Sequence, residues 1–136
     1  MIAPKNFIII LITIISVSTV IILNPFSENA DFSNFRFDAV YEKDSNSVSI
    51  TFIDTNGKSS FAVLEILGME STFHEEFEIY DSNFTKLVPL DKVPKYGWKT
   101  TPVTLEITYG ESIVYMKTEI HDTDQISPVV IFGKSD

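Results

Sequence analysis

The sequence predicts an all-β fold, a β-sandwich of seven or eight strands preceded by one N-terminal transmembrane helix. Three observations support this prediction. The 136-residue chain carries a run of 17 uncharged residues at positions 7–23. From residue 35 onward, apolar and polar residues alternate in several segments, which is the period of a strand with one buried and one wet face. Turn sequences divide this part at intervals of roughly 8–20 residues, which suits a small sandwich.

The predicted membrane segment, 7–23, reads FIIILITIISVSTVIIL. As a helix it spans about 25 Å, close to the ~30 Å hydrocarbon core of a bilayer. A cleaved signal peptide is the competing interpretation, but this run is longer than the usual apolar stretch of about 7–15 residues. Cleavage after Ala30 would also place Glu28 at the third position before the cut, which is unfavourable. The sequence therefore favours a retained signal anchor.

Flanking charge predicts the orientation of this anchor. Lys5 precedes the apolar run, whereas Glu28 and Asp31 follow it, and the positive end of such a helix stays in the cytoplasm. We therefore expect a cytoplasmic N-terminus at 1–6, a polar linker at 24–34 and an extracytoplasmic domain at 35–136. The expected localisation is the cell membrane, as a single-pass protein.

Three hydroxyl side chains of the anchor, those of Thr13, Ser16 and Thr19, recur every third residue and share one helix face. Such a face can form a weak contact with another membrane helix. The alternative is that each hydroxyl bonds back to a carbonyl of its own helix and has no further role.

The strands of the domain are predicted from two kinds of pattern. Apolar residues alternate with polar ones in 35–42, 48–52, 73–79 and 103–109. The runs 61–67 and 113–120 are apolar on both faces, which predicts central strands covered on two sides. Two short segments containing Pro, 84–90 and 128–132, predict edge strands. Turns are expected at 44–46 and 109–112, and Asn56-Gly57 predicts a tight hairpin.

Composition excludes several functional classes. The chain contains no Cys, which excludes a disulfide scaffold, a Cys-ligated metal site and thiol catalysis. A formal net charge of −9 argues against a nucleic-acid partner. The sequence has neither a Gly-rich phosphate loop nor a Gly-x-Ser-x-Gly motif. We therefore expect a protein that is not an enzyme, with no catalytic residues and no cofactor.

The segment Lys95-Tyr96-Gly97-Trp98-Lys99 is the first candidate site, because it holds the only Trp and lies between Pro94 and Pro102. Exposed aromatic rings between two Lys would form a partner-contact patch. The alternative is that Trp98 folds back and closes the open end of the sandwich.

Two weaker candidates involve polar loops. His121, Asp122 and Asp124 follow a predicted strand and could donate to a metal ion if further carboxylates converge on them. The favoured interpretation of these residues is a solvated acidic loop with no metal. Asn83 begins the glycosylation sequon Asn-Phe-Thr at a predicted turn, on the side expected to lie outside the membrane.

The order of a membrane segment, a polar linker and seven or eight strands with Trp98 between two of them resembles membrane-tethered immunoglobulin-like or fibronectin type III-like ectodomains. The resemblance covers about residues 35–124 and lacks the Cys pair of antibody-type domains. The layout is also similar to that of archaellum stator proteins.

The predicted function is a non-enzymatic, membrane-tethered module that presents its sandwich to an envelope or membrane-complex partner. One alternative is an extracytoplasmic carrier of a ligand or metal with the same fold. Another alternative is a pilin-like or archaellum-accessory subunit.

Overall fold

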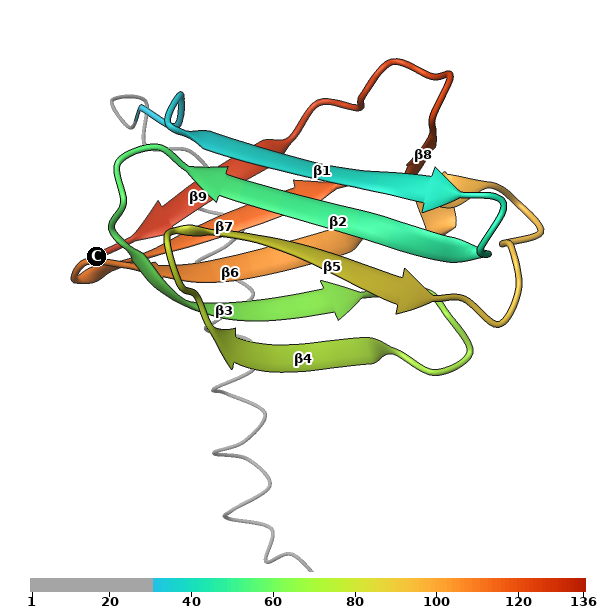
Figure 1. Cartoon of the computed structure of the whole chain (residues 1–136), viewed down its shortest axis with the longest axis horizontal. Helices are drawn as coiled ribbons and strands as arrows, with labels where there is room; N and C mark the ends of the chain where they lie inside the picture. Colours follow the sequence, from blue (N-terminus) through green and yellow to red (C-terminus); the bar gives the residue numbers. More distant parts are fainter. Residues whose placement is uncertain (1–30) are drawn as a thin grey trace, which may run out of the picture.

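The computed structural model describes residues 31–136, which fold into two β-sheets packed face to face (Figure 1). The described residues form β1 (Phe35–Glu42), β2 (Ser47–Asp54), β3 (Ser59–Ile66), β4 (Phe73–Glu78), β5 (Asn83–Pro89), β6 (Val103–Tyr109), β7 (Ser112–Thr118), β8 (His121–Asp122) and β9 (Ile131–Ser135). One sheet has the order β5-β2-β1-β8 and the other β4-β3-β6-β7-β9. The predicted all-β class is confirmed for this part of the chain, but the described residues form nine strands rather than the predicted seven or eight, because the two-residue β8 and the terminal β9 follow β7.

The core lies between the two sheets and is built from the alternation seen in the sequence. Every second residue of the central strands points inward, because successive side chains of a strand point to opposite faces. From the first sheet the buried side chains are Phe35, Phe37, Ala39, Val48, Ile50, Phe52 and Val88; from the second they are Ala62, Leu64, Ile66, Val103, Leu105, Ile107, Val114 and Met116. The predicted core faces of these strands are therefore confirmed.

Two predictions about individual strands are wrong. The runs 61–67 and 113–120 were expected to be covered on both sides, yet only one face of each strand is buried. Phe61 on the outer face of β3 is 36% exposed, and Lys117 on the outer face of β7 is exposed. These strands are central by their pairing with β4, β6 and β9. Their outer apolar residues occupy a partly wet surface rather than a second core.

The predicted hairpin at Asn56-Gly57 is also wrong, although the turn exists. Gly57 has the positive φ of 69° that such a turn needs. However, β2 and β3 belong to different sheets, because both edges of β2 are already paired, with β1 and with β5. The segment 55–58 therefore carries the chain from one sheet to the other. The expected turns after β1 and after β6 do form antiparallel hairpins.

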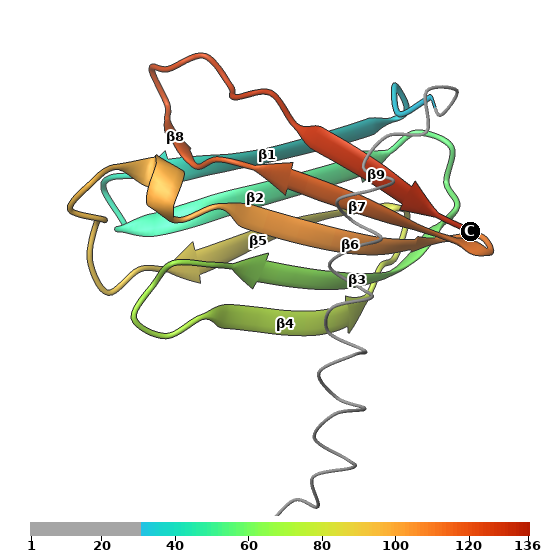
Figure 2. The same ribbon diagram turned by 180° about the vertical axis from the view of Figure 1, so that it is seen from behind.

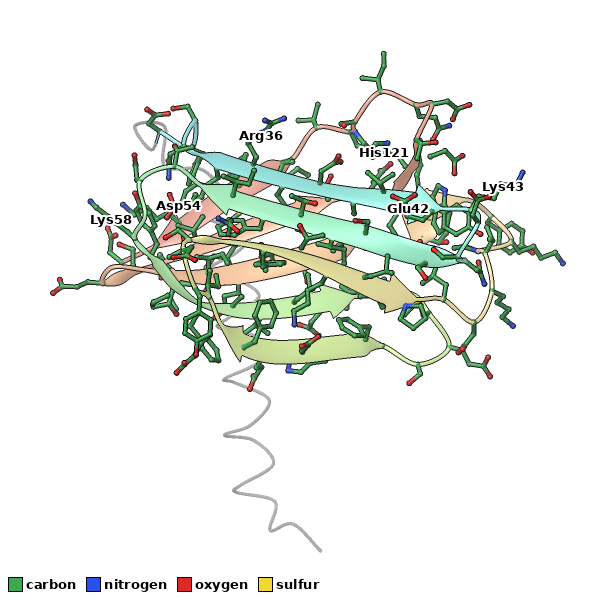
Figure 3. The ribbon with its side chains drawn as sticks, in the orientation of Figure 1. Arg36, Glu42, Lys43, Asp54, Lys58 and His121 are labelled. Atoms are coloured by element: carbon green, nitrogen blue, oxygen red, sulfur yellow. The ribbon has the colours of Figure 1, made fainter. Side chains whose placement is uncertain are left out.

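The carboxylate of Asp54 organises this crossover. It accepts hydrogen bonds from the backbone N–H groups of Asn56 (2.9 Å), Lys58 (2.9 Å) and Ser59 (3.0 Å). The side chains of Asn34 (2.9 Å) and Ser59 (2.8 Å) donate as well. Burial disfavours the charged carboxylate, but these donors outweigh that effect and hold the pKa of Asp54 below its ordinary value of 3.8. Figure 3 shows Asp54 and Lys58 at the same end of the sandwich.

The two open sides of the sandwich are closed differently. On the β4–β5 side, Lys86 forms an ion pair with Glu75 (2.9 Å) and lies 4.4 Å from the ring centre of Phe77. On the opposite side, Phe32 stacks on Phe132 of β9 with ring centres 4.9 Å apart. The last residues of the predicted linker thus pack on the domain. The edge strand predicted at 84–90 is confirmed as β5. The one predicted at 128–132 is displaced, because the edge strand β9 begins only at Ile131 and Pro128 lies before it.

The order of the strands places two sets of loops at opposite ends of the sandwich, as both views of the ribbon show (Figures 1 and 2). The first residues of β1 and the C-terminus lie at one end. The loops after β1, β3 and β5 and the crossing from β7 to β8 lie at the other end.

The predicted N-terminus 1–6, the membrane segment 7–23 with its Thr13, Ser16 and Thr19 face, and linker residues 24–30 lie outside the described residues. Within 31–136, no helix has the length and apolar character needed to cross a bilayer.

Candidate functional site

An open groove of about 540 Å³ lies at the end of the sandwich remote from Phe35. Its lining is more apolar than polar, and it brings together two segments that the sequence singled out separately. One wall comes from the loop before β6 and the other from the stretch around β8. The lining residues are Tyr96, Gly97, Trp98, Lys99, Glu119, Ile120, His121, Gln125, Ile126 and Pro128. Figure 3 shows His121 at the same end of the sandwich as Glu42 and Lys43.

The first wall is a single 3-10 turn, η1 (Trp98–Thr100), which is fixed by close contacts. Trp98 is partly buried against the core, and its ring centre lies 5.0 Å from that of Tyr41 on β1. Behind the turn, Gly68 approaches so closely that a Cβ at this position would lie 1.7 Å from the carbonyl oxygen of Thr100. The interpretation of Trp98 as a plug for the open end therefore agrees with its packing, while part of the side chain still lines the groove.

Tyr96 differs from Trp98 in its environment, because 80% of its surface is exposed. Across the groove, Ile126 is 95% exposed, and Val129 beyond it is 87% exposed. Apolar side chains this exposed are costly to leave in water when they gather in one place, and such patches mark interaction surfaces. Lys95 and Lys99, on either side of the aromatic pair, form no ion pair within residues 31–136.

The second wall is held by the ring of His121, which is only 6% exposed. Its Nε2 lies 2.7 Å from Oδ1 of Asp38 on β1, and its Nδ1 lies 2.8 Å from the carbonyl oxygen of Asp122. Each ring nitrogen therefore lies within hydrogen-bond distance of an oxygen that can accept. This contact reinforces the short parallel pairing of β8 with Val40 and Tyr41 of β1.

Ser127 also approaches this ring, but the arrangement is not that of a nucleophilic relay. Its Oγ lies 3.4 Å from Nε2 of His121, the same nitrogen that Asp38 contacts. A relay needs the carboxylate on one ring nitrogen and the hydroxyl on the other. The cluster therefore holds β1, β8 and the loop after β8 together.

The candidate metal ligands do not converge. The ring of His121 faces Asp38 rather than the carboxylate of Asp122, and Asp124 is exposed. Within residues 31–136, no group of three His, Asp or Glu side chains is arranged to hold a metal ion.

The sequon residue Asn83 opens β5 and is exposed, with its side-chain amide donating to the carbonyl oxygen of Asp81 (3.0 Å). Thr85 is also exposed on this edge strand, whereas Phe84 between them is partly buried and packs on Phe52 and Phe77. Both polar residues of the sequon thus lie on the outer surface, away from the groove.

A second ionisable cluster lies on the outer face of β3 and β4. His74 lies between Glu65 and Glu76, each 3.4 Å from one of its ring nitrogens. Its hydrogen bond to Glu65 raises the pKa of His74 above 6.5, slight burial opposes this, and Glu76 adds to the rise.

Two residues that build the groove had no place in the sequence analysis: Asp38, which contacts the lining residue His121, and Ile126, which lines the groove. Asp38 lies 83 residues before His121, and no local pattern joins them. Ile126 did carry a signal, because it is a lone large apolar residue in the polar stretch DTDQIS. A branched apolar residue in such a polar loop is a candidate contact residue.

No protein-family model, curated protein or solved structure matches this chain.

Proposed function

We propose that this chain is a non-enzymatic, single-pass membrane protein whose all-β domain binds a partner outside the membrane through the groove at Tyr96 and Ile126. The membrane part of the proposal rests on the uncharged run at 7–23 and on Lys5 before it. The partner part rests on the exposure of the groove's apolar side chains.

The observation that carries the proposal is the position of the groove relative to the start of the domain. β1 begins at Phe35 and reaches the groove at Tyr41, which contacts Trp98. Six residues of extended strand span about 20 Å. An anchor attached before β1 would therefore leave the groove on the side of the domain that faces away from the bilayer, where it is accessible to an envelope or membrane-complex partner.

We also propose that the domain is immunoglobulin-like or fibronectin type III-like in topology. In the immunoglobulin fold, strands A, B and E share one sheet, and strands C, F and G share the other. If β1, β2 and β5 are A, B and E, the first sheet follows the order E-B-A. If β3, β6 and β7 are C, F and G, the second follows C-F-G, with β4 in the place of C′. In this assignment β8 and β9 are additions after strand G.

Two measurements test the proposed function. First, the full-length chain should fractionate with membranes, and protease added outside intact cells or spheroplasts should remove the domain. Release of a soluble form that begins near Asp31, or full protection from protease, would contradict the anchor or its orientation.

Second, a photo-crosslinking amino acid in place of Tyr96 or Ile126 should capture one partner in native membranes. The same amino acid in place of Thr85 or Thr104, on the outer faces of the two sheets, is the matched control. Equal capture from all four positions, or none from the groove, would rule out the groove as the contact surface.

A further inference from the structure

We infer that the groove takes an extended peptide segment that places one large apolar side chain between Tyr96 and Ile126 and carries carboxylates next to it. This inference rests on the proposed function and names the chemistry of the partner.

The apolar part of the inference follows from what the groove exposes. Tyr96 is 80% and Ile126 is 95% exposed. Both line the same groove, beside the buried Ile120 and the half-buried Pro128. An apolar side chain inserted here would cover these residues and gain the free energy of burial, roughly 25 cal/mol for each Å² removed from water. The walls are already held by the Trp98–Tyr41 and His121–Asp38 contacts, so little ordering is needed on binding.

The polar lining argues against a hydroxyl-rich ligand such as a saccharide. Such a ligand needs several free donors and acceptors in the site. Both ring nitrogens of His121 are engaged, and Oε1 of Gln125 accepts from the backbone N–H of Asp122 (3.1 Å). Lys99 and Glu119 line the groove and form no ion pair in the described part of the chain, and these charges favour a charged ligand over a neutral sugar.

The acidic part of the inference follows from charge. The domain is acidic in total, since the chain carries 19 Asp and Glu against 10 Lys and Arg. Yet the bank of the groove beside Tyr96 carries two exposed lysines, Lys95 and Lys99, whose ammonium groups have no carboxylate partner within residues 31–136. Glu119 lies on the opposite wall. Carboxylates of the peptide next to its apolar side chain, on the side of Lys95 and Lys99, would complement these charges.

The test is a selection from random dodecapeptides displayed on phage, performed on the immobilised full-length chain in detergent micelles. We expect enrichment of peptides with an aromatic or large aliphatic residue flanked by Asp or Glu. The K95E/K99E variant should lose this pool and enrich peptides with Lys or Arg flanks instead. A K58E/K134E variant has the same net charge, with both changes away from the groove (Figure 3 shows Lys58 at the opposite end), and should select the same peptides as the parent chain.

The affinity of a selected peptide, measured through the fluorescence of Trp98, gives the size of the lysine contribution to binding. Reversal of both lysines should weaken binding about tenfold, as expected for loss of two exposed ion pairs. The same peptide should bind more weakly at high salt, because exposed charges are screened. Tyr96→Ala should abolish binding at an unchanged urea midpoint, since its side chain is largely exposed.

Three outcomes would overturn the inference. One is no enrichment on the parent chain, the second is enrichment of basic or purely polar peptides, and the third is enrichment that persists in Y96A. Saturable binding to a glycan array that is lost in Y96A would instead assign the groove to a saccharide. If crosslinking at Tyr96 captures a partner while the selection fails, the proposed function stands and only the acidic-peptide chemistry is wrong.

Discussion

Gly68 offers the sharpest test of how the groove is built. It lies in the loop between β3 and β4 with φ of +77°, and a Cβ here would lie 1.7 Å from the carbonyl oxygen of Thr100. Cβ contacts shorter than 3.0 Å are essentially not observed. Gly68→Ala must therefore separate this loop from η1 by at least 1.3 Å, the difference between those two distances. Because Trp98 belongs to that turn, we expect its packing in the groove wall to change.

The expected loss of unfolding free energy in Gly68→Ala has three parts. An alanine in the left-handed region costs about 1–2 kcal/mol. The hydrogen bond from the N–H of Leu67 to the carbonyl oxygen of Pro102 (3.0 Å) joins the same two loops, and its loss would add about 1 kcal/mol. Looser packing of Trp98 on Tyr41 would add about 1 kcal/mol, the scale of an aromatic pair. We expect a total of about 3–4 kcal/mol.

Gly110→Ala is the matched control. Gly110 has φ of +60°, but nothing lies within 4 Å of a Cβ at this position, so only the backbone cost of about 1–2 kcal/mol applies. The two variants therefore separate backbone strain from the clash with η1.

Urea unfolding of the full-length chain, followed by the emission of its only Trp, measures both effects. At a urea slope of about 1.5 kcal/mol/M, the midpoint of Gly68→Ala should fall by about 2 M and that of Gly110→Ala by about 1 M. The folded Gly68→Ala protein should also show red-shifted Trp98 emission, which Gly110→Ala should not. Equal midpoints with identical folded-state emission would refute the close approach of the two loops.

Three further predictions concern the rest of the domain. The folded-state pKa of Asp54 is below 3.8, so its hydrogen bonds stabilise the fold above pH 3.8, and this stabilisation is lost as pH falls through the lower pKa. Asp54→Asn should lower the free energy of unfolding by about 2–4 kcal/mol at pH 7. The difference in urea midpoint between the variant and the parent chain should narrow in acid. The raised pKa of His74 means that its ion pairs stabilise fully below pH 6.5 and weaken as pH rises through the folded-state value; NMR titration should give a midpoint above 6.5 that Glu65→Gln lowers. Residues 31–136 alone should fold without metal or reductant, because 18 buried apolar side chains form one core; circular dichroism that shows a random coil until metal is added would contradict this.

The sequence alone determined the local features of this domain. Strand faces follow from alternation, because a period of two sends Phe35, Phe37 and Ala39 to one side whatever the strand pairs with. Turns at 44–46 and 109–112 follow from short polar segments between such strands. Pro89 predicted an edge strand, because a residue without a backbone N–H cannot donate the hydrogen bond that a central strand needs.

Only the tertiary structure decided how these strands combine. The partner of β3 is not chosen by Asn56-Gly57 but by the occupied edges of β2, which are filled by β1 and β5. Likewise, a run that is apolar on both faces, such as 61–67, does not show whether another layer of the protein covers its outer face.

The groove could not be predicted from the sequence, for the same reason. Its walls depend on contacts between residues distant in the chain, Asp38 with His121, Tyr41 with Trp98, and Gly68 with Thr100. Periodicity describes which way a side chain points along its own strand, but it carries no information on what lies opposite. Tyr96 and Trp98, two residues apart in one motif, therefore have different roles: one ring is exposed and the other is packed on β1, because sheet packing brought Tyr41 under only one of them.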